Sequence, residues 1–192
     1  MDASQDFEAQ LAYGNEGEHE VGAWMIRRGH PVIPLYPPHS DEGVALQGRG
    51  APSILWANGG ERIAKALPDL AVFPPSGIML VEVKRKRKWV RFRGGTETGF
   101  NASLYREYSE IADRIDVPVW VFFLHEHEEP TGWFAQSLTV LRRDAPPRLW
   151  DGRHHKSGLS ILPPMVLWPL SVLVPLRNHP ACANLATSTG LD

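Results

Sequence analysis

Three residues with chemically useful side chains, Asp69, Glu82 and Lys84, lie on one predicted β-hairpin. Two apolar runs, 70–73 and 78–83, flank the tetrapeptide Pro-Pro-Ser-Gly, a pattern that predicts two antiparallel strands joined by a short turn. If the turn is centred on that tetrapeptide, Asp69 lies directly opposite Glu82, with Cβ atoms about 5 Å apart. Because side chains alternate along a strand, Glu82 and Lys84 project from the same face.

This arrangement predicts metal-dependent chemistry on phosphates. Two opposed carboxylates repel each other unless a cation lies between them, and carboxylate oxygens with water suit Mg²⁺ or Mn²⁺. Lys84 beside the metal could orient a water molecule or offset charge that develops on a phosphate. The structural alternative is that Asp69 only begins a strand, while Glu82 and Lys84 form a solvated surface pair.

A basic segment begins at the same lysine. Residues 84–93 (KRKRKWVRFR) contain seven Lys and Arg residues in ten positions. Such a cluster neutralises phosphates, and its aromatic residues, Trp89 and Phe92, could stack on unpaired bases; the alternative is an ordinary solvated face. The glycine-rich stretch 94–99 then predicts a mobile loop that orders on substrate. We expect nucleic-acid contacts from Arg85, Lys86, Arg87, Lys88, Trp89, Arg91 and Arg93.

Hydrophobic periodicity predicts the elements that position these residues. Tyr105 and Tyr108 fall on the second of two amphipathic helices, where each could contact a phosphate or simply pack at the edge of the core. A long loop is expected over the proline-rich stretch that follows the first helix. The predicted elements besides the hairpin are a helix over 16–28, a strand over 30–36, a loop over 37–60, a helix over 103–115, a buried strand over 119–124 and a strand or strand plus helix over 132–141.

The motif resembles that of the PD-(D/E)xK nuclease superfamily. Pro68-Asp69 is followed, thirteen positions after the aspartate, by Glu82-Val83-Lys84 at the end of an apolar strand. The resemblance implies an α/β fold with a restriction-endonuclease-like core, in which a central mixed sheet is flanked by helices in the order αβββαβ. It also implies that Asp69 and Glu82 hold Mg²⁺ or Mn²⁺, with the Val83 carbonyl as a further ligand, and that Lys84 is catalytic.

The same resemblance identifies Glu18 as the third carboxylate, catalytic and metal-binding. Resolvases of this superfamily place a glutamate eleven residues before a glycine that ends the first helix, with apolar residues three and seven positions after it. Glu18 fits, with Val21, Met25 and Gly29 at those spacings. The alternative is a solvated acidic helix start that interacts favourably with the helix dipole.

The predicted activity is metal-dependent hydrolysis of phosphodiester bonds in DNA. One rival is a non-catalytic nucleic-acid-binding or assembly protein that retains a nuclease-like fold. A second rival is a Mg²⁺-dependent enzyme that acts on small nucleotides. The basic segment favours a polymeric substrate, and an acidic pair beside a lysine has no use in a protein that only binds phosphates.

Composition excludes several other classes of protein. The 192 residues carry a formal net charge of −2, so the charge balance alone does not mark a nucleic-acid binder. The single cysteine, Cys182, excludes an intramolecular disulfide and a multi-cysteine zinc site. Four prolines interrupt the apolar stretch 162–176, and we expect a cytoplasmic protein with no membrane segment.

We expect a nuclease-like domain over 1–145 and a proline-rich extension over 146–192 that packs on the core or mediates assembly. A homodimer is possible.

Overall fold

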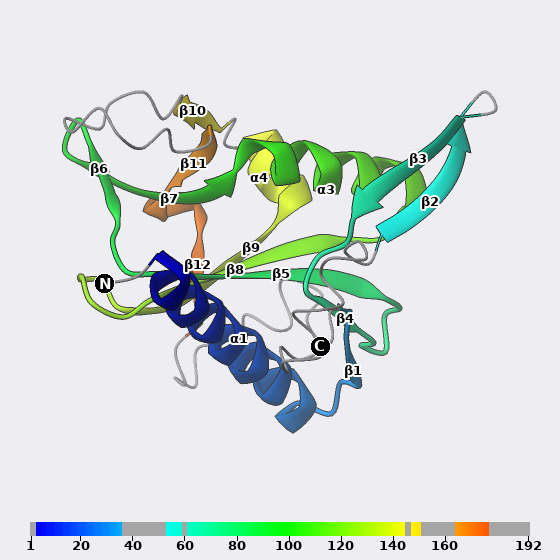
Figure 1. Cartoon of the computed structure of the whole chain (residues 1–192), viewed down its shortest axis with the longest axis horizontal. Coiled ribbons are helices and arrows are strands. Elements are labelled where there is room, and N and C mark those ends of the chain that lie inside the picture. Colours follow the sequence, from blue (N-terminus) through cyan, green and yellow to red (C-terminus); the bar gives the residue numbers. More distant parts are fainter. Residues whose placement is uncertain (1–2, 36–52, 59–60, 145–146, 151–163, 177–192) are drawn as a thin grey trace.

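The fold is organised around a six-stranded mixed sheet (Figure 1). The computed structural model describes residues 3–35, 53–58, 61–144, 147–150 and 164–176. The strand order of this main sheet is β1-β4-β5-β8-β9-β12. Its strands are β1 (Val32–Pro34), β4 (Leu70–Val72), β5 (Met79–Lys86), β8 (Val119–His125), β9 (Gly132–Ser137) and β12 (Val174–Pro175).

Helices cover both faces of the main sheet. Helix α1 (Ala3–Arg27) packs on one face, whereas α3 (Ala102–Ile115) and α4 (Leu138–Asp144) lie on the other (Figure 1). On the α1 face, Val21 and Met25 pack against Val81 and Val83 of β5. Among the described residues, no helix combines the length and the apolar character that crossing a membrane requires.

The predicted hairpin and its register are confirmed. Strands β4 and β5 are antiparallel, and Leu70 pairs with Val81, as the centred turn requires. Strand β8 runs parallel to β5 on its other side, because the intervening helix α3 returns the chain to the same end of the sheet. The succession of α1, β1, β4, β5, α3 and β8 confirms the predicted αβββαβ core with its central mixed sheet.

A second sheet replaces the mobile loop that the sequence predicted over 94–99. Strand β6 (Val90–Phe92) turns directly into β7 (Gly95–Asn101), and Arg93 and Gly94 both have positive φ, at 49° and 78°. This backbone matches the tight hairpin turns that twist with their strands. The small sheet has the order β10-β11-β7-β6, with β10 (Arg148–Trp150) and β11 (Met165–Pro169) from late in the chain.

Two further expectations need correction. The first helix begins at Ala3 rather than near Glu16, because Gly14 and Asn15 lie inside it and do not break it. The predicted loop over 37–60 contains strand β2 (Ser53–Asn58), which pairs with β3 (Glu61–Ala66) in a two-stranded ribbon that projects from the body (Figure 1). The rest of the predicted loop lies outside the described residues.

Late segments of the chain join both sheets. Strand β11 pairs with β7, and β12 pairs with β9, with the short 3-10 helix η1 (Leu170–Val172) between them. Trp168 of β11 is fully buried in the cluster that also holds Phe100 and Ile111. The domain boundary near residue 145 stays a prediction.

Candidate functional site

Strand β5 directs the central residues of the site. Its Val81 and Val83 side chains face α1, whereas Leu80 packs in the cluster on the α3 face. Because side chains alternate along a strand, Glu82 and Lys84 also point to the α3 face. Glu82 and Lys84 therefore share one face of the sheet, as predicted.

Glu82 is buried, and both of its oxygens face polar neighbours. Only 1% of its surface is exposed, and the Tyr108 hydroxyl of α3 donates a hydrogen bond to Oε2 at 2.7 Å. Oε1 forms an ion pair with the Lys84 amine. Burial alone would lower the pKa of Lys84, but the carboxylates of Glu82 and Asp69 outweigh it and raise that pKa above its ordinary value. Lys84 is therefore held as a cation at neutral pH.

Asp69 lies just before β4, one residue beyond the last ladder pair of the hairpin. Continuing the β4–β5 register by one residue places it opposite Glu82. Its Oδ2 accepts a hydrogen bond from the Val83 backbone N–H at 2.7 Å, which fixes the carboxylate against β5. Burial, and then the nearby negative charge of Glu82, raise the pKa of Asp69 well above its usual range. Two carboxylates this close together, one buried and one half-buried, repel each other and favour binding of a cation between them.

Helix α1 brings Glu18 toward this group. At the preceding position, Gly17, a Cβ would meet Val83 Cγ1 at 3.4 Å, so the helix backbone approaches β5 closely. Burial raises the pKa of Glu18, and its charge also interacts with Lys84 and Glu82. The four predicted side chains of Glu18, Asp69, Glu82 and Lys84 therefore lie within electrostatic reach of one another.

The two acidic neighbours of Glu18 have structural partners instead. Glu16 pairs with Arg85 of β5, and Glu20 accepts a hydrogen bond from Trp133 Nε1 of β9 at 2.8 Å. These contacts fix α1 on either side of Glu18. The sequence did not predict them, because the partners are 69 and 113 residues away along the chain.

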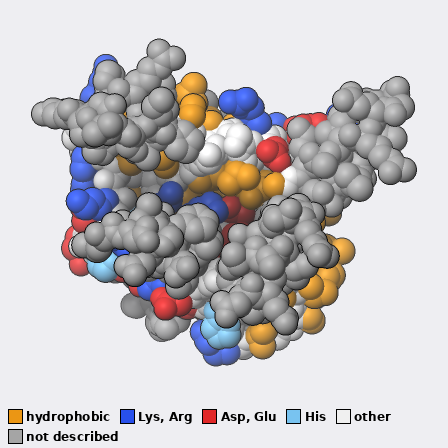
Figure 2. Space-filling view, viewed as in Figure 1, with side chains coloured by type: hydrophobic (Ala, Val, Ile, Leu, Met, Phe, Trp, Pro, Cys, Tyr) orange, Lys and Arg blue, Asp and Glu red, His pale blue; other side chains and the backbone are white. Residues whose placement is uncertain are grey.

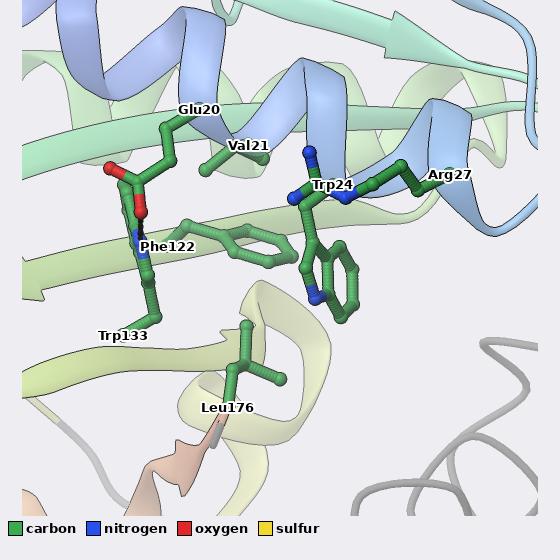
Figure 3. Close-up of a pocket in the computed structure, with 7 residues that line it drawn as sticks. All are labelled: Glu20, Val21, Trp24, Arg27, Phe122, Trp133 and Leu176. Carbon is green, nitrogen blue, oxygen red and sulfur yellow. Dashed lines mark hydrogen bonds between the residues drawn. The ribbon is translucent and has the colours of Figure 1, made fainter. Parts of the chain in front are cut away.

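The Glu20–Trp133 bond also closes one wall of a pocket between α1 and the main sheet that has both polar and apolar lining residues. Trp24 points from α1 toward Leu176, with the Phe122 ring beside it (Figure 3). The Trp24 and Phe122 rings meet edge to face, with centroids 6.2 Å apart. This pocket lies on the α1 face of the sheet, whereas Glu82 and Lys84 point to the other face. It helps to seat α1 and contains none of the predicted catalytic side chains.

The donor set suits a hard divalent cation held by few side chains. Carboxylate oxygens of Asp69 and Glu82 are the ligand type that Mg²⁺ prefers, and Mg²⁺ commonly keeps several waters beside one or two carboxylates. Within the described residues, no three His, Cys, Asp or Glu side chains are gathered closely enough to hold an ion together. Glu18 therefore lies near the pair without completing a three-carboxylate cage.

Trp89 requires a correction, because it is a core residue. Only 5% of its surface is exposed, and its ring stacks on His125 with centroids 3.4 Å apart. Its Nε1 donates to the Glu128 and Pro130 carbonyl oxygens. Trp89 is therefore unable to stack on a base. Burial lowers the pKa of His125 to about 4, so this ring is neutral at pH 7.

The two tyrosines also differ from the predicted nucleic-acid contacts. Tyr108 is 2% exposed and serves Glu82 rather than a phosphate. Tyr105 packs edge to face on Trp168, with ring centroids 5.6 Å apart, at the edge of the core. A buried tyrosine and a core-edge tyrosine have the same helical spacing in the sequence, which is why the pattern alone did not separate them.

The basic residues take three different environments. Arg85 is engaged with Glu16 and Glu126. Burial, and then the charge of Lys84, lower the pKa of Lys86 to about 8. Arg87, Lys88, Arg91 and Arg93 are exposed. Lys and Arg side chains gather along the left of the molecule and also meet acidic side chains in a central hollow (Figure 2).

Two solved structures are similar to this chain. One is Hjc, a Holliday junction resolvase from the archaeal hyperthermophile Archaeoglobus fulgidus, which is 13% identical with a TM-score of 0.40 over 67% of this chain and 78% of that chain. The other is D212, a nuclease from a fusselovirus, also 13% identical with a TM-score of 0.40, over 86% of each chain. No protein-family model matches the chain, and no curated protein does.

Proposed function

We propose that this protein is a metal-dependent nuclease that hydrolyses phosphodiester bonds in DNA. The observation that carries the proposal is the group of buried Glu82 and half-buried Asp69 and Lys84, in which two carboxylates and a protonated amine meet beside the start of a basic segment. A carboxylate such as Asp69, whose pKa is raised first by desolvation and then by a second carboxylate, is costly to the fold. Such cost is typical of functional sites.

Each residue of the group has a role in the proposed reaction. Asp69 and Glu82 would hold Mg²⁺ or Mn²⁺, with the Val83 carbonyl as a further ligand and Glu18 holding a second ion or an ordered water. When bound, the cation would supply Lewis-acid polarisation of the phosphate. Lys84 would orient the attacking water or offset negative charge in the transition state. Tyr108 keeps Glu82 in place through its hydrogen bond.

Cleavage assays on defined DNA test this function. Supercoiled, linear duplex and single-stranded DNA would each be incubated with Mg²⁺, Mn²⁺ or EDTA. We expect metal-dependent cleavage that falls by about 100-fold or more in Lys84→Ala and Asp69→Asn, the scale typical of a lost transition-state contact. Tyr108→Phe should cause a smaller loss, because it removes only the bond that positions Glu82. Arg143→Ala, which alters an exposed cation paired with Asp144, is the matched control and should cleave normally.

One observation favours the alternative of a non-catalytic nucleic-acid-binding protein. Lys84 already neutralises Glu82 through an ion pair, so the group is also consistent with a structural pair left inside a nuclease-like fold. Isothermal titration with Mg²⁺ and Mn²⁺ separates the two. Metal binding that disappears in Asp69→Asn supports the nuclease. Wild-type protein that binds DNA, but binds no metal and cleaves no DNA, supports the alternative. The homodimer and the cytoplasmic location stay predictions.

A further inference from the structure

An exposed aromatic ring on the small sheet has no role in the site described above. Phe92 is 40% exposed, and it lies on β6, the edge strand of the order β10-β11-β7-β6. Trp89, three residues earlier, is buried, so the structure separates the two aromatic residues of the basic segment. An apolar side chain on an unprotected edge strand favours unwanted pairing with another chain. The residues around Phe92 therefore indicate whether the ring has a use of its own.

The strand register leaves the Phe92 ring without a cross-strand side chain. Phe92 pairs with Gly95 of β7, and residues that oppose each other in an antiparallel pair project from the same face. A glycine in that position cannot cover the ring. No side chain of β7 therefore covers the ring from the opposing position.

Arginines supply positive charge around this ring. The Arg148 guanidinium carbon lies over the ring, 4.0 Å from its centroid, and the Arg93 guanidinium carbon lies 5.2 Å from it. Glu97 fixes Arg148, because Arg148 Nε donates to Glu97 Oε2 at 2.9 Å. Arg148 comes from 56 positions later in the chain, so no local sequence pattern connects it with Phe92. A planar, fixed guanidinium supports stacking on an adjacent ring.

We propose that Phe92 and Arg148 form a stacking site for an unpaired DNA base, with Arg93, whose guanidinium also lies near the ring, contacting an adjoining phosphate. The inference rests on the proposed function and names its substrate class, DNA with a single-stranded segment. Every base has a π-face, so stacking on an aromatic ring tolerates any sequence, whereas the stacked bases of an intact duplex hide these faces. The chain segment from Lys84 near the end of β5 to β6 contains the basic residues that would contact the DNA strand between the catalytic group and the stacking site.

Binding in EDTA tests the stacking site without cleavage. The probe is a single-stranded oligonucleotide that contains 2-aminopurine, whose fluorescence is quenched by stacking, together with the same strand in a duplex. For the full chain we expect tighter binding of the single strand and quenching of the probe. Phe92→Leu should weaken single-strand binding by about 5- to 100-fold, the range of one lost base–aromatic stack, and abolish the added quenching.

Two further variants make the test specific. Arg148→Gln should also weaken binding of the single strand, because it removes the cation that backs the ring. Ile78→Ala, which trims another exposed hydrophobic side chain that is 48% exposed, should bind as the wild type does. Thermal unfolding followed by circular dichroism checks that every variant is folded.

Two results would overturn the stacking site. One is a folded Phe92→Leu protein that binds and quenches the probe as the wild type does. The other is a wild-type chain that binds no single-stranded oligonucleotide in EDTA. The proposed nuclease function fails on a different result, an absence of cleavage with Mg²⁺ or Mn²⁺, so the two failures are distinguishable.

Discussion

At the level of single residues, the two carboxylates of the site differ in their polar partners. One has a hydroxyl and an amine beside it, and the other has a single backbone hydrogen bond. Glu82 is buried, but the Tyr108 hydroxyl and the Lys84 amine both contact it. Asp69 accepts one backbone hydrogen bond, and burial and the Glu82 charge still raise its pKa. The folded protein therefore binds a proton at Asp69 more readily than the unfolded chain does, which makes stability depend on pH.

The substitution Asp69→Asn should stabilise the metal-free protein at neutral pH. A carboxyl group whose pKa is raised on folding contributes stability while it is protonated and loses that stability as the pH rises from its unfolded value, about 4, through its folded value. Asparagine keeps an oxygen that can accept the Val83 N–H, but carries no charge. Each tenfold change in proton affinity corresponds to about 1.4 kcal/mol.

Urea unfolding in EDTA from pH 4 to pH 8 measures this effect. The advantage of Asp69→Asn over the wild type should be largest near pH 8 and should vanish near pH 4. Ser76→Asn, an exposed turn substitution, controls for a general effect of asparagine. Parallel stability curves for Asp69→Asn and wild type would show that Asp69 is not electrostatically disfavoured in the fold.

The sequence predicted these residues better than it predicted their surroundings. Asp69, Glu82 and Lys84 follow from the hairpin alternation and from a turn only a few residues long, both of which are local features. Trp89 was misplaced because its burial depends on His125, 36 positions away, which a charged segment gives no reason to expect. Local patterns report local pairing, whereas burial beneath a distant strand leaves no periodic signal.

At the level of secondary-structure elements, glycine content explains both a missed strand and its close packing. Strand β7 has the sequence GTETGFN, whose glycines indicated a loop. In the structure, Gly99 lies so close to β11 that a Cβ there would meet the Val166 carbonyl oxygen at 1.7 Å. The glycine is therefore required by the close approach of two backbones and not by flexibility.

Alanine substitutions at two glycines should have opposite effects. Gly99→Ala forces β7 and β11 apart and should lower the free energy of unfolding by at least about 3 kcal/mol, as expected for severe overpacking. Gly14→Ala, in a helix with nothing within 4 Å of the added carbon, should raise it by about 0.5–1 kcal/mol through helix propensity. Urea unfolding of both variants is the measurement, and a Gly99→Ala protein as stable as wild type would contradict the β7–β11 packing.

At the level of the whole molecule, the two sheets depend on a segment that lacks a clear sequence pattern. Strands β11 and β12 are nearly consecutive in the chain, yet β11 completes the small sheet and β12 extends the main one. Trp168 and Leu173 of this segment lie in the same core cluster as Tyr108 and Phe123. The αβββαβ core was predictable because its elements alternate in hydrophobic periodicity. The joining segment was not, since its prolines interrupt any regular spacing.

A chain that ends at Asp144 should therefore fail to form the cooperative native state. The truncation removes β11, which exposes the edge of β7 and deletes the fully buried Trp168. An uncovered strand edge favours aggregation. We expect loss of the cooperative urea transition, loss of near-ultraviolet circular dichroism and loss of cleavage, even though Asp69, Glu82 and Lys84 are all present. Adding residues 145–192 as a separate peptide provides the control, because recovered cooperativity would assign the defect to the missing strands. A truncated chain that unfolds with the midpoint and slope of the full protein would instead establish residues 1–144 as an independent domain, to whose stability strands β10, β11 and β12 contribute nothing.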